Sequence, residues 1–328
     1  MHLSLRFPVS RIRMCLTTLI LLFLGQPGST WAIIEGEDAV QGEFPATAAI
    51  IQKGSFANPA VIGGGVLIRE QWVLTAAHSL ILQSSATIEV HTGVADLTNP
   101  IGLVTRNVLA IIVHPDFVQI DGTSENDAAL LLLDRPIPGA ATLPIADRLG
   151  DLPAGTPGTV VGWGTTEAGV PQPSPILQKG GANIVENSLA STFFPGLVNE
   201  SHVAARDPSV TTSPCIGDSG GPLIIDIDGV PTVAGLVSFG IADCSDASVP
   251  AVYTSMPEAF SWIAGVLSTS ASPSAISLTG RNRIISNGDL NPRRLDSTDF
   301  GSVRARRGMR TRTFFVQNES IGFLTVPS

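Results

Sequence analysis

Residues 213–223 read SPCIGDSGGPL, and this stretch decides the fold because of what it places around Ser219. Asp218 precedes the serine, and two glycines follow it. A serine in an ordinary turn needs no such neighbours. A serine that attacks a carbonyl carbon needs an exposed oxygen and backbone N–H groups that point at the oxyanion as it forms. The stretch therefore predicts a nucleophilic serine, and the rest of the chain must supply its base.

Two stretches farther upstream supply the partners that such a serine needs. WVLTAAHSL (72–80) places His78 at the end of an apolar run that has the length of a strand. SENDAALLLLDRP (124–136) places Asp127 at the start of a second apolar run. The serine needs a base to accept its proton, and the base needs a carboxylate that orients it and stabilises its charged form. His78, Asp127 and Ser219 can fill these roles.

The composition favours a β-rich globular protein. The chain has 328 residues, of which 44% are hydrophobic and 14% are charged, so it can bury a sizeable core. Its 33 Gly and 24 Pro separate many short apolar runs, a pattern typical of strands joined by turns. One segment differs, since PEAFSWIAGVLSTS (257–270) has apolar residues at helical spacing and predicts a helix.

The charge is distributed unevenly along the chain. Residues 33–270 contain 7 basic and 24 acidic residues, whereas residues 271–328 contain nine Arg and four acidic residues. An acidic main body argues against nucleic acid as a partner.

The N-terminus has the features of a signal peptide. Arg6, Arg11 and Arg13 precede the apolar run MCLTTLILLFLG (14–25), which is short for a membrane span. Thr30-Trp31-Ala32 then offers small residues at the positions that a signal peptidase prefers, which predicts cleavage after Ala32. The alternative is an uncleaved N-terminal anchor. We expect export, with the membrane as a partner only during export.

The ordered motifs resemble those of the chymotrypsin-like serine proteases of the trypsin family, over residues 33–270. The resemblance implies two six-stranded antiparallel β-barrels with a C-terminal helix. It also implies a secreted serine endopeptidase that cleaves protein or peptide substrates through an acyl-enzyme, without cofactor or metal. The matching stretches, in the family's order, are IIEGEDA, GGGVLI, TAAH, NDAALL, VVGWGTT, GDSGGPL, LVSFG and VPAVYT.

The resemblance gives each catalytic residue a role. His78 corresponds to the general base, Asp127 to the buried carboxylate that orients it, and Ser219 to the nucleophile. The backbone N–H groups of Gly217 and Ser219 correspond to the oxyanion hole.

The resemblance also implies an activation ion pair. In this family, a new amino terminus inserts beside the carboxylate that precedes the serine; here these residues are Ile33 and Asp218. The family's usual basic residue before the cut is absent, because Ala32 stands there. Signal removal after Ala32 would therefore activate the enzyme directly. The alternative is a cut near Gly28 or Ser29, followed by self-processing.

The specificity pocket can be assigned in the same way. Ser213 occupies the floor position, where trypsin-type members carry an aspartate, and Gly240 and Ala251 occupy its walls. Ser238, Phe239 and Gly240 correspond to the segment that pairs with the substrate backbone. A pocket without a carboxylate disfavours Arg and Lys, so we expect a preference for apolar residues of small to medium size.

Three cysteines complete the pattern. Cys15 lies in the signal segment, which leaves Cys215 and Cys244 as an even pair in an oxidising compartment and predicts one disulfide. The resemblance pairs the same two residues. Another pair, which commonly flanks the catalytic histidine in the family, is replaced by Gly63 and Ser79.

The other histidines receive no catalytic role. His2 and His91 lie in no comparable motif, and we interpret His114 and His202 as structural.

The chain divides into a signal peptide (1–32), a protease domain (33–270), a Ser/Ala/Pro-rich linker (271–282) and a tail (283–328). Through STDFGSV and RTFFVQN, the tail resembles the first strands of an ASPM/SPD-2/Hydin immunoglobulin-like domain, which would support cell-surface association. The alternative is a disordered basic tail. Two rival functions remain: a catalytically silent binding module on the protease fold, and a surface-attached structural protein.

Overall fold

The computed structural model describes residues 33–54, 60–99, 101–120, 122–168 and 172–270, together with three short strands farther along. The first half forms a closed barrel in the order β2-β3-β4-β9-β6-β5. Its strands are rich in branched apolar residues, and their inward side chains form much of the core. The strands are β2 (Thr47–Gln52), β3 (Val61–Arg69), β4 (Trp72–Thr75), β5 (Ile88–Thr92), β6 (Val104–Val113) and β9 (Ala129–Leu133).

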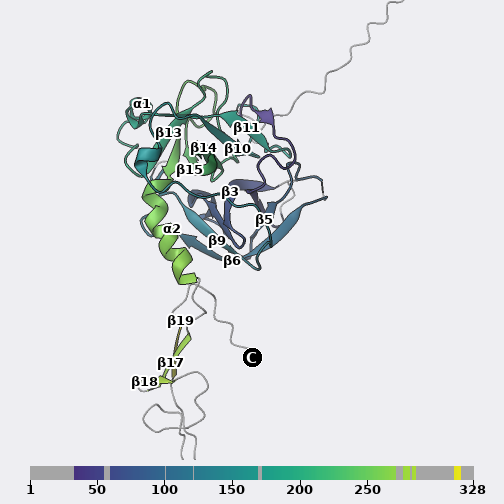
Figure 1. Ribbon diagram of the computed structural model, residues 1–328, viewed down its shortest axis with the longest axis vertical. Helices are drawn as coiled ribbons and strands as arrows, with labels where there is room; N and C mark the ends of the chain where they lie inside the picture. The colour runs from purple at the N-terminus through teal and green to yellow at the C-terminus, as the bar shows by residue number, and fades with distance from the viewer. Residues whose placement is uncertain are drawn as a thin grey trace, which may run out of the picture.

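The second half forms one eight-stranded sheet in the order β1-β11-β10-β14-β15-β16-β13-β12, above the barrel in Figure 1. The strands are β1 (Glu37–Asp38), β10 (Gly158–Gly162), β11 (Gln178–Gly181), β12 (Asn183–Val185), β13 (His202–Arg206), β14 (Pro222–Ile227), β15 (Val230–Phe239) and β16 (Ala251–Ser255). The expectation of two six-stranded barrels therefore needs a correction, because only the first barrel is closed by strand ladders.

The reason for the difference lies at the edge strand β12. The N–H of Ala182 donates to the carbonyl of Gly158, and the N–H of Ile184 donates to that of Thr156, each over 2.9 Å. These bonds bring the edge back against the segment that leads into β10. Strand β12 has only three residues, and its Ile184 bonds to Thr156, which precedes β10. Isolated hydrogen bonds therefore form there instead of a strand ladder.

The helix predicted over residues 257–270 is present as α2 (Met256–Ser270). Its buried residues recur every three or four positions, so one face packs on the core. Trp262 of α2 contacts His114, which follows β6, with ring centroids 4.8 Å apart. The helix follows β16 of the sheet in sequence and contacts the barrel through Trp262, so it connects the two halves (Figure 1). A short helix, α1 (Asn187–Phe193), and two 3₁₀ turns, η1 (His78–Leu80) and η2 (Leu149–Asp151), were not predicted.

A small hairpin joins β6 to β9. It consists of β7 (Val118–Ile120) and β8 (Thr123–Glu125), and its second strand leads directly to Asp127. This hairpin forms part of the site described below.

Three strands beyond α2, one in the linker segment and two in the tail, form an antiparallel sheet in the order β18-β17-β19. They are β17 (Ile276–Gly280), β18 (Arg283–Ile285) and β19 (Phe314–Asn318). The motif STDFGSV (297–303) lies outside the described residues, whereas RTFFVQN (312–318) ends in β19. The immunoglobulin-like resemblance of the tail is not shown by these strands.

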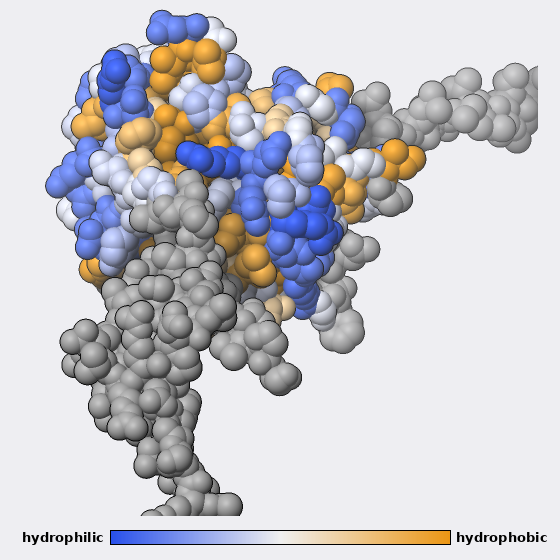
Figure 2. Space-filling view, turned by 60° about the horizontal axis from the view of Figure 1, so that its bottom comes forward, coloured by the Kyte–Doolittle hydropathy of each residue, from blue (hydrophilic) through white to orange (hydrophobic). Residues whose placement is uncertain are grey.

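Hydrophilic and hydrophobic residues are interspersed over the face shown in Figure 2. Among the described residues, none of the helices is both long and hydrophobic enough to span a bilayer.

Candidate active site

Loops at the ends of strands bring three side chains to the junction of the two halves. His78 begins η1 just after β4, Asp127 comes just before β9, and Ser219 lies in the loop before β14. His78 and Ser219 both line a cavity of about 210 Å³. Asp127 lies behind the histidine and is fully buried.

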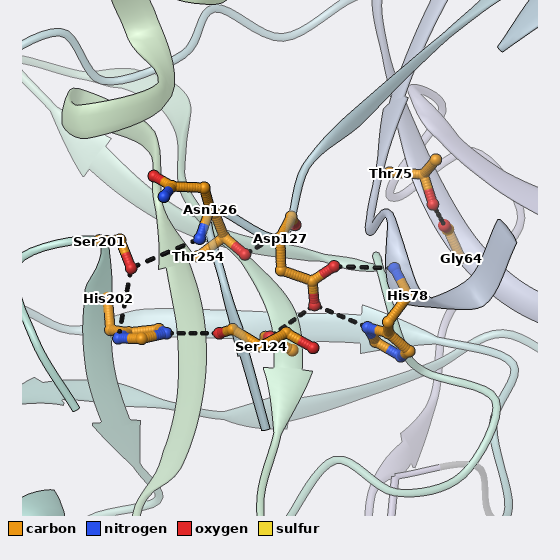
Figure 3. A network of polar contacts seen from close by, with 10 residues as sticks. Gly64, Thr75, His78, Ser124, Asn126, Asp127, Ser201, His202 and Thr254 are labelled. Atoms are coloured by element: carbon orange, nitrogen blue, oxygen red, sulfur yellow. Dashed lines mark hydrogen bonds and ion pairs between the residues drawn. The ribbon is translucent and has the colours of Figure 1, made fainter. Parts of the chain in front are cut away.

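Asp127 is held by several hydrogen bonds (Figure 3). Its Oδ1 accepts the backbone N–H of His78 over 2.9 Å, and its Oδ2 lies 2.6 Å from His78 Nδ1. The same Oδ2 accepts the Ser238 hydroxyl over 2.6 Å, while the Thr254 hydroxyl donates to the Asp127 carbonyl over 2.8 Å. A buried carboxylate accepts hydrogen bonds only, so Nδ1 of His78 carries a proton and Nε2 remains available as a base.

The loop around Ser219 leaves two backbone donors free. Gly217 has a φ of +96°, and a side chain there would bring a Cβ within 2.9 Å of the Gly164 Cα. Within the described residues, the N–H groups of Gly217 and Ser219 have no acceptor. The Ser219 hydroxyl likewise makes no hydrogen bond to His78 there, a bond that often tightens only when substrate is bound. Two free N–H groups beside a serine can receive an oxyanion.

Ile33 and Asp218 lie together beneath this loop. Both residues are fully buried. Asp218 accepts the N–H of Gly164 over 2.8 Å and that of Cys215 over 2.9 Å. Burial raises the pKa of Asp218 to about 7, although hydrogen bonds from the backbone of Cys215, Gly164 and Ile33 oppose this shift. The predicted partners of the activation pair are therefore adjacent.

The cavity beside Ser219 has mostly apolar walls. Gly240 and Ala251 line it, as do Ser238 and Phe239, so four predicted pocket residues come together. Ser213, the predicted floor of the pocket, is buried but is not among the lining residues, whereas its neighbour Pro214 is. The lining residues are His78, Gln119, Gly122, Ser124, Pro214, Cys215, Ile216, Ser219, Val237, Ser238, Phe239, Gly240, Ile241, Ala242, Cys244 and Ala251.

Comparison with known proteins agrees with this arrangement, since the trypsin family matches residues 33–263. The chain belongs to the trypsin family. It is 34% identical to human granzyme M over 78% of this chain and 99% of that protein. It is 33% identical to the suppressor of tumorigenicity 14 protein homolog of Bos taurus, over 70% of this chain but only 28% of that protein.

The structure of neuropsin, described as a serine protease expressed in the limbic system of mouse brain, is similar to this chain with a TM-score of 0.63. The two are 26% identical, and the match covers 72% of this chain and all of neuropsin (100%). As a member of the trypsin family, the chain is a serine-type endopeptidase and thus a hydrolase.

The predicted disulfide of this trypsin-family chain is confirmed. Cys215 and Cys244 are bonded, with their Cα atoms 5.6 Å apart, and both line the cavity. Gly63 and Ser79 are also adjacent, since a Cβ at Gly63 would lie 3.4 Å from the Ser79 Cβ. The family's missing cysteine pair would therefore fit in space, although that Cβ would also come within 2.8 Å of the Ser219 carbonyl oxygen.

Several residues of the site have no recognisable signal in the sequence. The stretch LVSFG indicates substrate pairing for Ser238 but carries no sign that its hydroxyl reaches Asp127. Gln119, Gly122 and Ser124 lie in no motif, and the β7–β8 hairpin brings them to the cavity. A hairpin's position over a distant loop follows from long-range packing, which single-sequence patterns do not encode. Among the described residues, no group of three or more His, Cys, Asp or Glu side chains is arranged to hold a metal.

Proposed function

We propose that this trypsin-family endopeptidase is exported and cleaves peptide bonds with Ser219 as nucleophile, His78 as base and Asp127 as the orienting carboxylate. The observation that supports the proposal best is the 2.6 Å contact between Asp127 Oδ2 and His78 Nδ1, beside a cavity that His78 shares with Ser219. Export rests on the predicted signal peptide and agrees with the Cys215–Cys244 disulfide, because disulfides persist in oxidising compartments.

In the first step, Ser219 Oγ attacks the carbonyl carbon of the scissile bond while His78 Nε2 takes the hydroxyl proton. The negative charge moves to the carbonyl oxygen, where the N–H groups of Gly217 and Ser219 stabilise it. The imidazolium that forms is stabilised by Asp127, whose carboxylate stays charged.

The intermediate then collapses as the C–N bond breaks. His78 gives its proton to the leaving amine, and an ester links the substrate acyl group to Ser219. Water attacks this ester with His78 again as base, and Ser219 is released with its proton restored. Asp127 also accepts the Ser238 hydroxyl, so the carboxylate keeps a partner through both steps.

We infer that the pocket accepts apolar residues of small to medium size. The cavity has about 210 Å³, and the described residues that line it include no Asp, Glu, Lys or Arg. Pro214 and Ala251 are among the residues that line it. An Arg or Lys side chain would bury a charge without a partner, which is strongly unfavourable.

We expect peptides with Ala, Val or Leu before the scissile bond to exceed the Arg and Lys analogues in kcat/KM by roughly 10²- to 10³-fold. A positional peptide library with mass-spectrometric product assignment measures this preference. Ala251→Gly provides the matched variant, and it should shift the preference toward Phe and Tyr by widening the pocket. Dominant cleavage after basic residues would show that a carboxylate reaches the cavity.

Labelling with a fluorophosphonate tests the proposed function. The reagent reacts only with an activated serine, so we expect one label per molecule, located at Ser219 by peptide mapping. His78→Ala should abolish the label, because the serine then lacks its base. A folded wild-type protein that takes no label would instead favour a silent binding module or a structural protein.

A further inference from the structure

His202 is a buried histidine that the proposed mechanism does not use. It is the first residue of β13 and has 3% of its surface exposed. Its Nε2 lies 2.7 Å from the carbonyl oxygen of Ser124, in β8 of the hairpin (Figure 3). Its Nδ1 accepts the backbone N–H of Asn199 over 3.2 Å. The side chain therefore joins the eight-stranded sheet to the hairpin that precedes Asp127.

The two backbone partners fix the protonation state of the ring. The N–H of Asn199 can only donate, so Nδ1 of His202 must be unprotonated. The Ser124 carbonyl can only accept, so Nε2 must carry the hydrogen. Only the neutral Nε2–H form of His202 satisfies both backbone groups. The Ser201 hydroxyl also lies 3.5 Å from Nδ1, but it donates to the Asn199 side-chain oxygen over 2.7 Å. A second proton on Nδ1 would face the N–H of Asn199.

The same ring also supports the substrate cavity from behind. Phe239, which lines the cavity, packs edge-on against His202 with ring centroids 5.4 Å apart. Phe194 holds the phenyl ring from another side, with centroids 5.5 Å apart. Ser124 lines the cavity as well. His202 therefore touches two lining residues that are separated by more than a hundred positions in the sequence.

Other hydrogen bonds hold the residues that follow the hairpin, Asn126 and Asp127. The backbone N–H of Asn126 donates to the Ser201 hydroxyl over 3.5 Å, and Thr254 binds the Asp127 carbonyl. The bond from His202, by contrast, reaches Ser124 within strand β8 of the hairpin, over 2.7 Å. If this bond is lost, the side of the cavity that the hairpin forms can move, while the Thr254 hydroxyl still donates to the Asp127 carbonyl.

We propose that His202 is a positioning residue that sets the width of the substrate cleft by holding Ser124 and Phe239 together. The inference rests on the proposed function, because it assigns the cavity to substrate. Loss of the neutral ring would loosen the cleft and weaken substrate binding, while the contacts of Asp127 with His78 would persist. The effect would therefore fall mainly on KM rather than on kcat.

The same geometry makes substrate binding sensitive to acid. Burial lowers the pKa of His202, although the backbone of Ser124, the charges of Glu125 and Asp127, and the backbone of Asn199 oppose the shift. A lowered pKa keeps the ring neutral in the folded protein at neutral pH. The stability of the fold declines as the pH falls below the ordinary value of 6.5. The ring of the folded protein gains its second proton only when the pH reaches the lowered pKa, and KM should rise there.

Three variants test the proposal by steady-state kinetics on one neutral peptide substrate between pH 5 and 8. His202→Leu removes both hydrogen bonds and should raise KM about tenfold at pH 7.5, with kcat changed less than about threefold. His202→Gln keeps a donor for Ser124 but cannot gain a proton, so its KM should stay near the wild-type value and lose the acid rise. His91→Gln, on β5 of the barrel, is the matched histidine control.

The outcomes separate this inference from the proposed function. If the wild type takes no fluorophosphonate label, the proposed function fails, whatever the His202 variants do. If the label is taken but His202→Gln keeps the full acid rise in KM, the inference is wrong and the rise belongs to another group. The inference is also wrong if His202→Leu and His202→Gln lower kcat and raise KM to the same extent. If His202→Leu does not fold, the pH profile of His202→Gln still decides.

Discussion

Replacement of Ser219 by alanine is expected to lower kcat roughly 10⁶-fold while leaving KM for a good peptide within a few fold. The variant loses the oxygen that would form the acyl-enzyme. It keeps the free N–H groups of Gly217 and residue 219 and the whole cavity, so substrate still binds. Initial rates on a chromogenic peptide ester and on the amide, at enzyme concentrations set by absorbance, measure the loss.

Asp127→Asn provides the comparison that separates the roles of the two residues. Asp127 accepts hydrogen bonds at both oxygens, whereas an amide accepts only at its oxygen. The NH2 group of Asn would therefore face either the backbone N–H of His78 or the pair His78 Nδ1 and Ser238, so the histidine loses its orientation or its tautomer. We expect a loss of roughly 10⁴-fold, smaller than for Ser219→Ala. A Ser219→Ala protein that cleaves as fast as the wild type, with no trace of contaminating protease, would contradict the assignment of the nucleophile.

Much of the fold follows from local sequence signals. The run ALLLL of β9, buried except for the partly buried Leu132, is apolar enough to indicate a strand in the core, and the helix over 257–270 has a clear spacing of apolar residues. The family motifs then place these elements in order. Because each motif belongs to one strand end or loop, the fold that joins those ends also brings His78 and Ser219 to one cavity.

The remainder depends on contacts that no local pattern records. Closure of the second half depends on three hydrogen bonds at or next to the three-residue strand β12, and a sequence cannot show whether such a strand forms a ladder. We interpret His202 as structural from the sequence, where it has no catalytic motif around it. Its contact with Ser124 spans 78 positions, so only the tertiary structure reveals it. The same holds for the hydroxyl of Ser238.

The amino terminus provides the second large expected effect. Ile33 is a β-branched residue with a φ of 56°, in the left-handed region that such residues rarely adopt. A peptide bond before Ile33 makes this conformation costly, by roughly 1–3 kcal/mol. A terminal residue has no φ, so cleavage after Ala32 would remove this cost. It would also convert the amide nitrogen beside Asp218 into an ammonium.

The sign of the pH dependence follows from Asp218. Its folded pKa of about 7 lies above the ordinary value of 3.8, so the uncleaved fold holds a proton that the unfolded chain releases. The stability of the uncleaved chain therefore falls as the pH rises from 3.8 to about 7. An Ile33 ammonium would offset the buried charge above that range, until the amine itself loses its proton. Tyr253, whose pKa is raised by burial and then by Asp218, stays neutral throughout.

We therefore expect protein that begins at Ile33 to be more stable at pH 8 than protein that retains Ala32, by about 3–5 kcal/mol. Urea denaturation of both forms, made in the Ser219→Ala background to prevent self-processing, measures the difference. The difference should shrink as the pH falls below 7, because Asp218 then becomes protonated in the uncleaved form. Asp218→Asn should abolish most of it.

Sequencing the N-terminus of the exported Ser219→Ala protein then identifies the route. Ile33 as the first residue means that signal removal activates the enzyme directly, whereas Ser29 or Thr30 means that the wild type processes itself. Self-processing after Ala32 is chemically consistent with a narrow uncharged pocket that accepts alanine. Fully active wild-type protein that retains residues before Ile33 would contradict both routes, and it would show that Asp218 orders the oxyanion loop without an ammonium partner.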